Sequence, residues 1–180
     1  MLRPGRSARC GYPLALGTVV LLMALSGCTL AGQSGTASGA AGASCQTAQL
    51  TLGKAGDENG DGNFANVFSL RNRSQQTCTL KGYPRIELLD ASERSMTFAV
   101  EQKTSAYLFN TQKPALVTLA PGASSYFMLE WSAGPTSCPG TAFVLLTPPG
   151  DQATLQIASA MEICAGPVIV SPIFENSPFR

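Results

Sequence analysis

Apolar and polar residues alternate in short stretches along most of the chain after residue 45. A period of two places alternate side chains on opposite faces of an extended backbone and is typical of half-buried β-strands. In residues 46–52, for example, Ala48, Leu50 and Leu52 lie between Thr and Gln residues. The same period recurs in residues 64–70, 86–88, 96–100, 127–131, 143–146, 155–157 and 168–170. No convincing helical period interrupts the pattern, so it predicts strands throughout.

Turn-forming residues separate these stretches and keep the predicted strands short. They are rich in Gly, Pro, Asn and Asp and lie at residues 60–63, 82–84, 121–122, 148–150 and 166–167. About seven to nine short strands with frequent turns in one domain favour an all-β fold, and we expect an immunoglobulin-like antiparallel β-sandwich.

The N-terminal segment has the three parts of a secretory signal: a basic start, a short apolar run and small residues before a break. Three arginines fall within the first nine residues, and the apolar run follows over residues 13–25. The ending Leu25-Ser-Gly-Cys28 resembles the bacterial lipobox, which implies that Cys28 becomes the first exported residue and carries lipid. The run has about thirteen residues, fewer than the roughly 20 of a bilayer-spanning helix, which argues against a permanent transmembrane segment.

The segment after the predicted lipidation site is composed of small residues. Residues 29–44 are Gly, Ala, Ser and Thr with one Gln and one Leu, a composition that cannot bury enough apolar surface to fold. We expect a flexible tether that spans roughly 20–25 Å. The rest of the chain is the right size for one domain. The predicted organisation is therefore a signal peptide over residues 1–27, a tether over residues 28–44 and a β-sandwich domain over residues 45–180.

The charge of the exported chain argues against nucleic acid as a partner. Removing the signal takes away three of the twelve Lys and Arg residues and none of the eleven Asp and Glu residues, which leaves a formal charge of −2. The densest basic cluster is the pair Arg71 and Arg73. A phosphate backbone requires a much larger basic face, so we expect no nucleic-acid binding.

Four cysteines remain in the exported domain, and an even number in an oxidising compartment usually forms disulfides. If the first two strands form a hairpin, the residue before the first strand lies beside the residue after the second, which pairs Cys45 with Cys78. The hairpin formed by residues 143–146 and 155–157 pairs Cys138 with Cys164 in the same way. A zinc site is disfavoured because the chain has no histidine and no close cysteine pair.

Several of these features together resemble one known family, the actinobacterial domain of unknown function 4232 family. The resemblance is carried by the string from Asn72 through Cys78 to Gly82-Tyr-Pro84, by Pro121-Gly122 before a strand that ends in Trp131, and by Cys138 and Cys164-Ala-Gly166. It implies an exported, often lipid-anchored β domain. It implies no known activity and no catalytic residues.

A calcium-loop pattern occurs between the first two predicted strands. Asp57, Asn59 and Asp61 supply oxygen atoms at the first, third and fifth positions of such a loop, and Gly62 stands at the sixth. The twelfth position, however, is Phe68 where a bidentate Glu is needed. The alternative is a hairpin tip, because Gly, Asn and Asp tolerate a positive φ. We favour the turn and keep these residues as a weak calcium candidate.

Catalytic candidates are few because the usual general base, histidine, is absent. Glu130 lies beside Trp131, but adjacent strand residues point to opposite faces. We therefore expect Trp131 in the core and Glu130 in solvent. A carboxylate-based glycan hydrolase would need two acidic side chains about 5–10 Å apart in one cleft, drawn from Asp90, Glu101, Glu130 and Glu162.

Three aromatic residues are weak candidates for partner binding: Tyr107, Phe109 and Tyr126. The first two lie in residues 104–113, a segment without a clear strand pattern. Such a segment is either a long loop that presents exposed aromatics to a partner or an edge strand that lies against the sheet.

These observations favour a cell-envelope lipoprotein that acts as a non-enzymatic binding or adhesion module on the outer face of the cytoplasmic membrane. Its expected partners are the membrane, through the lipid anchor, and an envelope protein or glycan. We expect no catalytic residues and no cofactor. The alternatives are the glycan hydrolase and a structural or accessory envelope subunit.

Overall fold

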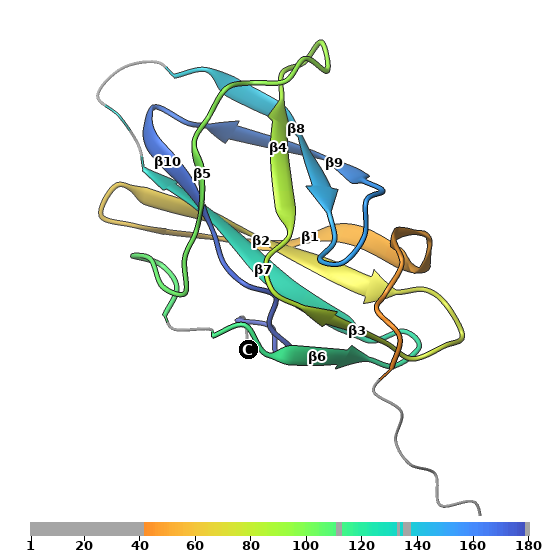
Figure 1. Ribbon diagram of the computed structural model, residues 1–180. Coiled ribbons are helices and arrows are strands. Elements are labelled where there is room, and N and C mark those ends of the chain that lie inside the picture. Colours follow the sequence, from red (N-terminus) through yellow and green to blue (C-terminus); the bar gives the residue numbers. More distant parts are fainter. Residues whose placement is uncertain (1–41, 111–112, 133, 135–137, 179–180) are drawn as a thin grey trace, which may run out of the picture. The chain divides into compact units, whose positions relative to one another are not determined.

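The computed structural model describes residues 42–110, 113–132, 134 and 138–178 (Figure 1). The predicted signal peptide, Cys28 and most of the tether lie outside this part of the chain. The described residues form one short 3-10 helix, η1 (Thr47–Gln49), and ten strands. The strands are β1 (Leu50–Gly60), β2 (Asn63–Asn72), β3 (Cys78–Lys81), β4 (Arg85–Leu89), β5 (Val100–Gln102), β6 (Leu116–Leu119), β7 (Ser124–Ser132), β8 (Gly140–Thr147), β9 (Leu155–Glu162) and β10 (Ala165–Val170).

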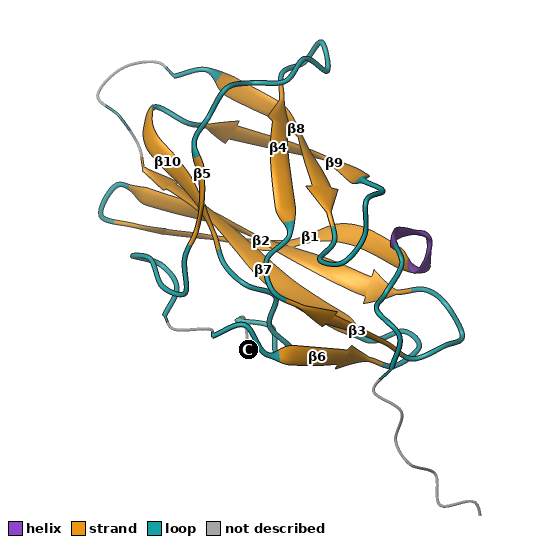
Figure 2. Ribbon diagram, in the orientation of Figure 1, coloured by secondary structure: helices purple, strands orange, loops and turns teal. Residues whose placement is uncertain are grey.

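The strands form three sheets, which confirms the predicted all-β sandwich (Figure 2). The largest sheet has the order β1-β2-β7-β10-β5, a second has the order β4-β8-β9, and β3 pairs with β6. All pairs are antiparallel except β5 with β10, which run parallel. The ten described strands exceed the upper end of the expected range, nine, by one, and one pair departs from the antiparallel pattern.

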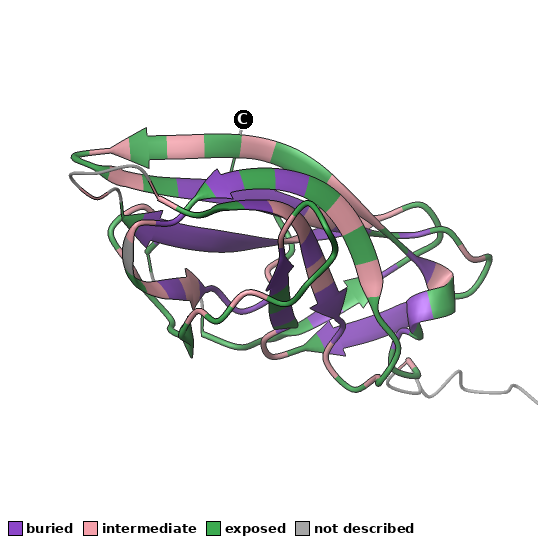
Figure 3. Cartoon of the chain, turned by 90° about the horizontal axis from the view of Figure 1, so that it is seen from above, coloured by how far each residue is buried: buried purple, intermediate pink, exposed green. Residues whose placement is uncertain are grey.

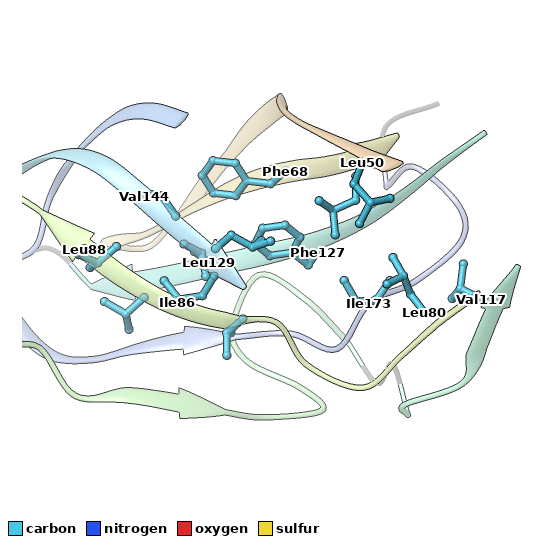
Figure 4. Close-up of a cluster of buried hydrophobic side chains, with 14 of the residues drawn as sticks. Leu50, Phe68, Leu80, Ile86, Leu88, Val117, Phe127, Leu129, Val144 and Ile173 are labelled. Atoms are coloured by element: carbon cyan, nitrogen blue, oxygen red, sulfur yellow. The ribbon is translucent and has the colours of Figure 1, made fainter. Parts of the chain in front are cut away.

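The main core lies between the five-stranded sheet and the two smaller sheets (Figure 4). Phe68 of β2 and Phe127 of β7 stack with ring centroids 5.2 Å apart and point toward Ile86 and Leu88 of β4. Figure 3 shows the alternation behind this packing as bands of buried, intermediate and exposed residues along the strands. The period of two in the sequence thus marks which side chains enter the core.

A second apolar cluster covers the opposite face of the five-stranded sheet. It is built from Ala65, Val67, Phe109 and Met128, with Ala106, Leu108, Tyr126, Ile169 and Phe174 packed against it. Residues 104–110 supply part of this cover without forming a strand. This segment therefore lies against the sheet as a loop, so each of the two sequence interpretations was right in part.

The β1–β2 hairpin is longer than the sequence indicated. Residues 46–49 were expected in the first strand, but residues 47–49 form η1. The strand continues instead to Gly60, and only Asp61 and Gly62 form the turn, with φ of 47° and 78°. Two central residues with positive φ are typical of a tight hairpin turn. The favoured interpretation as a hairpin is confirmed, with the turn confined to Asp61 and Gly62, whereas Asp57 and Asn59 of the weak calcium candidate lie within β1.

Two disulfides join the cysteines in the two pairs expected from the hairpins. Cys45 bonds to Cys78 with a Cα separation of 4.8 Å, and Cys138 bonds to Cys164 with a separation of 4.6 Å. Cys45 and Cys78 belong to the main core. The second bridge lies at the flanks of the β8–β9 hairpin.

Candidate ligand-binding site

A cavity opens where an edge of the five-stranded sheet meets an edge of the three-stranded sheet. These edges are β1 and β9, which contact one another. Asn66 of β2 donates a 3.0 Å hydrogen bond from Nδ2 to Ser159 Oγ of β9 and so links the two sheets. Beside this bond, toward the β1–β2 turn, lies a cavity of about 410 Å³, here called the edge cavity. It is lined by Lys54, Asp57, Glu58, Asn59, Phe64, Ala65, Asn66, Trp131, Gly134, Cys138, Ala160, Met161, Glu162 and Cys164.

Two stacked aromatic rings line the edge cavity. Phe64 of β2 and Trp131 of β7 are cross-strand partners with ring centroids 6.0 Å apart and an interplanar angle of 22°. Trp131 belongs to the main core and is 7% exposed, which confirms its predicted position. Phe64 is 39% exposed. A large apolar ring that stays accessible inside a cavity is a typical surface for holding a small ligand.

A β-bulge decides which side chains of β1 face the edge cavity. Up to Lys54, the even-numbered residues share the core face with their partners on β2, and Leu52 pairs with Leu70. The register then shifts between Lys54 and Gly56, so one extra residue, Ala55, reverses the alternation. After the shift, the odd-numbered Asp57 and Asn59 face the core side. Without the bulge they would point to the opposite face of the sheet.

The polar lining comes from both edge strands. Asp57 of β1 forms an ion pair with Lys54, three residues earlier. Glu162 of β9 lines the edge cavity from the other sheet. The disulfide between Cys138 and Cys164 adds a covalent part to the wall and fixes the chain just after Glu162. The arrangement presents an aromatic surface beside groups that accept hydrogen bonds.

Two of the three residues kept as a weak calcium candidate have other partners. Asp57 pairs with Lys54, and the Asp61 carboxylate accepts a hydrogen bond from the Tyr107 hydroxyl. Asn59 lies within β1, opposite Phe64. No group of three or more His, Cys, Asp or Glu side chains in the described part of the chain is arranged to hold a metal ion.

Glu130 is buried, contrary to the expectation that it is solvated. It lies on the face opposite Trp131, as expected, but only 2% of it is exposed. Its two carboxylate oxygens accept hydrogen bonds from the backbone N–H groups of Tyr107 at 2.9 Å and Leu108 at 2.8 Å. Glu130 therefore anchors residues 104–110 to the sheet and is not available as an acid or base in an open cleft.

The three candidate binding aromatics do not form one exposed surface. Phe109 is 6% exposed and packs in the second apolar cluster, and Tyr126 is half-buried and stacks on Phe174 at 6.2 Å. Tyr107 is 60% exposed. Its hydrogen bond to Asp61 and, to a smaller extent, desolvation raise the pKa of its hydroxyl. Two of the three are therefore packing residues, and this part of the prediction was wrong.

The carboxylates considered for a hydrolase are dispersed over the fold. Asp90 caps the turn after β4, and the backbone N–H and then the guanidinium of Arg94 lower its pKa. Glu101 of β5 pairs with Lys103 at 2.7 Å. Of the four residues considered, Glu162 alone lines the edge cavity. The sequence did not single out Asp57 as its neighbour in the lining, since nothing in the pattern placed β1 beside β9.

Comparison with known proteins identifies the domain. The family model described as "Domain of unknown function (DUF4232)" matches residues 45–180. No curated protein matches the chain. In the described residues, no helix has the length and apolar character needed to cross a bilayer.

Proposed function

Because this chain belongs to the DUF4232 family, whose function is unknown, we propose a function from its candidate site: the protein is a non-enzymatic binding module of the cell envelope. The observation that carries the proposal is the edge cavity, where Phe64 remains 39% exposed against Trp131. Its volume of about 410 Å³ falls within the range of small-molecule sites. The ligand is a small molecule or the terminal group of an envelope glycan or protein.

The proposal places the domain on the outer face of the cytoplasmic membrane. Its support is the lipobox-like ending at Cys28 and the small-residue tether over residues 28–44. A Cys28→Ala variant is expected to be released from the membrane fraction or to accumulate as the unprocessed precursor. Retention in the membrane at the size of the processed protein would contradict lipid anchoring.

Fluorescence of the single tryptophan tests the binding function directly. Trp131 is the only tryptophan of the chain and lines the edge cavity, so its emission reports on this site. Fractions of envelope glycans and peptides are titrated into the purified protein. A saturable change in emission is expected in the wild type and is expected to be lost in Phe64→Ala.

Two controls make this experiment decisive. Leu116→Ala removes another exposed apolar side chain, 56% exposed on β6 and outside the edge cavity, and is expected to bind as the wild type does. If Phe64→Ala fails to fold, Phe64→Leu is used instead, because it removes the ring and keeps an apolar side chain. An absence of any saturable change, or a change that survives both Phe64 variants, would refute the proposal.

Glycan hydrolysis is retained as the second candidate function, because Asp57 and Glu162 line the same cavity from two strands. Two carboxylates in one cleft are the minimum for this chemistry. The release of reducing ends from envelope glycans, lost in Glu162→Gln, would favour hydrolysis over binding alone. A purely structural subunit is a weaker candidate, since it has no need of a cavity with an accessible ring.

A further inference from the structure

The ionisable groups that line the edge cavity are mostly acidic. They are Lys54, Asp57 and Glu162, with a formal charge of −1, because Glu58 pairs with Ala65 and points to the opposite face of the sheet. Lys54 is held by Asp57 in an ion pair, so its positive charge is already balanced. Glu162 takes part in no ion pair among the described residues. The excess of negative charge is therefore not neutralised by the protein.

This excess lies on a concave part of the surface. A concave surface lined by one sign of charge between low-dielectric walls focuses the field and attracts ions of the opposite sign. An anionic ligand would meet repulsion at this site, and a cation would be attracted.

The aromatic pair adds a second preference for a cation. Phe64 is covered on one side by Trp131 and keeps 39% of its surface exposed. The face of an aromatic ring carries partial negative charge, and it attracts ammonium groups, especially where water is excluded. A quaternary or alkylated ammonium group matches both features, because its substituents can contact the ring and its charge can be balanced by the Glu162 carboxylate.

We propose that the edge cavity binds a small organic cation, with the ammonium group against Phe64 and close to Glu162. This inference rests on the proposed function, since it assigns a ligand class to the same site. The occupant is a compact ammonium compound or the ammonium-bearing end of a larger envelope molecule.

The test compares two probes of the same shape. Choline is titrated into the purified full chain, and so is its neutral isostere, in which carbon replaces the ammonium nitrogen. Binding is followed by Trp131 fluorescence and by the NMR signal of the Trp131 indole N–H, at constant ionic strength. Choline is expected to bind saturably and at least roughly tenfold more tightly than the neutral isostere.

Matched variants separate the charge from the shape of the site. Glu162→Gln keeps the size of the side chain and is expected to weaken choline binding severalfold while it leaves the neutral isostere unaffected. Glu87→Gln removes another exposed strand glutamate of the same sheet, outside the edge cavity, and is expected to have no effect. Equal binding of the two probes, or choline binding that is insensitive to Glu162→Gln, would overturn the inference.

The outcomes also distinguish the inference from the function on which it rests. If envelope fractions change Trp131 emission and choline does not, the binding module stands and the cationic ligand is wrong. If neither changes Trp131 emission, both proposals fail. If choline binds with the expected dependence on Glu162, both are supported.

Discussion

Glu130 and Trp131 are consecutive residues of β7 whose side chains lie on opposite faces of the sheet, as strand geometry requires. The sequence predicted this opposition and the core position of Trp131. It did not predict the burial of Glu130, because the cover comes from residues 104–110, which have no periodic pattern. Side-chain direction follows from neighbouring residues, whereas burial depends on segments that are distant in the sequence.

Replacing Glu130 tests its role as an anchor. Glu130→Gln leaves one oxygen for two backbone N–H donors and removes the charge that strengthens both bonds, so the free energy of unfolding is expected to fall by about 1–3 kcal/mol. Urea denaturation measures this change. Glu101→Gln, which removes a carboxylate from a half-exposed ion pair, serves as the control and should change stability little. An equally small effect at Glu130 would contradict the anchoring role.

Asp151 makes the stability of the fold depend on pH in the acidic range. The backbone N–H of Thr47 and then its hydroxyl donate to Asp151 Oδ2 at 2.6 and 2.8 Å, and they lower the pKa of Asp151 from 3.8 to about 2. Since the folded chain binds this proton less readily than the unfolded chain, stability is present above pH 3.8 and is lost as pH falls toward 2. Denaturation of Asp151→Asn should show a shallower loss over this window. An unchanged slope would exclude Asp151 as the cause.

At the scale of elements, the sequence predicted strands best where the alternation was long and clear. It identified β2, β4, β7, β8, β9 and β10, and it missed β3 and β6, which have only four residues each. The strand expected over residues 96–100 was wrong except at Val100, where β5 begins. The second half of β1 is rich in Gly, Asp and Asn and was assigned to a turn. Pairing with β2 holds it extended. The candidate site was missed for the same reason, since it depends on this extension, on the bulge at Ala55 and on the approach of β9.

Gly62 in the β1–β2 turn tests the energetic cost of a positive φ, because a side chain added there would not clash with other atoms. Gly62 has φ of 78°, and a Cβ added there would meet no atom within 4 Å. Gly62→Ala is therefore expected to destabilise the fold by about 1–2 kcal/mol through backbone strain alone. Gly140→Ala is the matched control, because a Cβ there is equally unobstructed and the φ is not in the positive range. Thermal unfolding compares the two, and equal effects would contradict the strain argument.

At the scale of the whole molecule, the two disulfides crosslink different regions: Cys45–Cys78 lies in the main core, and Cys138–Cys164 lies at the flanks of the β8–β9 hairpin. Each closes a loop of similar length, with sequence separations of 33 and 26. Replacing either pair by alanine is expected to reduce stability by roughly 3–4 kcal/mol on the chain-entropy model. Only the Cys138–Cys164 bridge lines the edge cavity. Its removal should also alter Trp131 emission in the folded state, whereas removal of Cys45–Cys78 should not, and identical spectra would contradict this difference.

The length of β1 determines how far the edge cavity stands from the point where the chain enters the domain. Residue 42 and η1 precede the first end of β1, and the Asp61-Gly62 turn lies at the other end (Figure 1). An extended strand of this length spans roughly 35 Å. The edge cavity, which is lined by the second half of β1, therefore lies near the end of the domain opposite the one where the described chain begins.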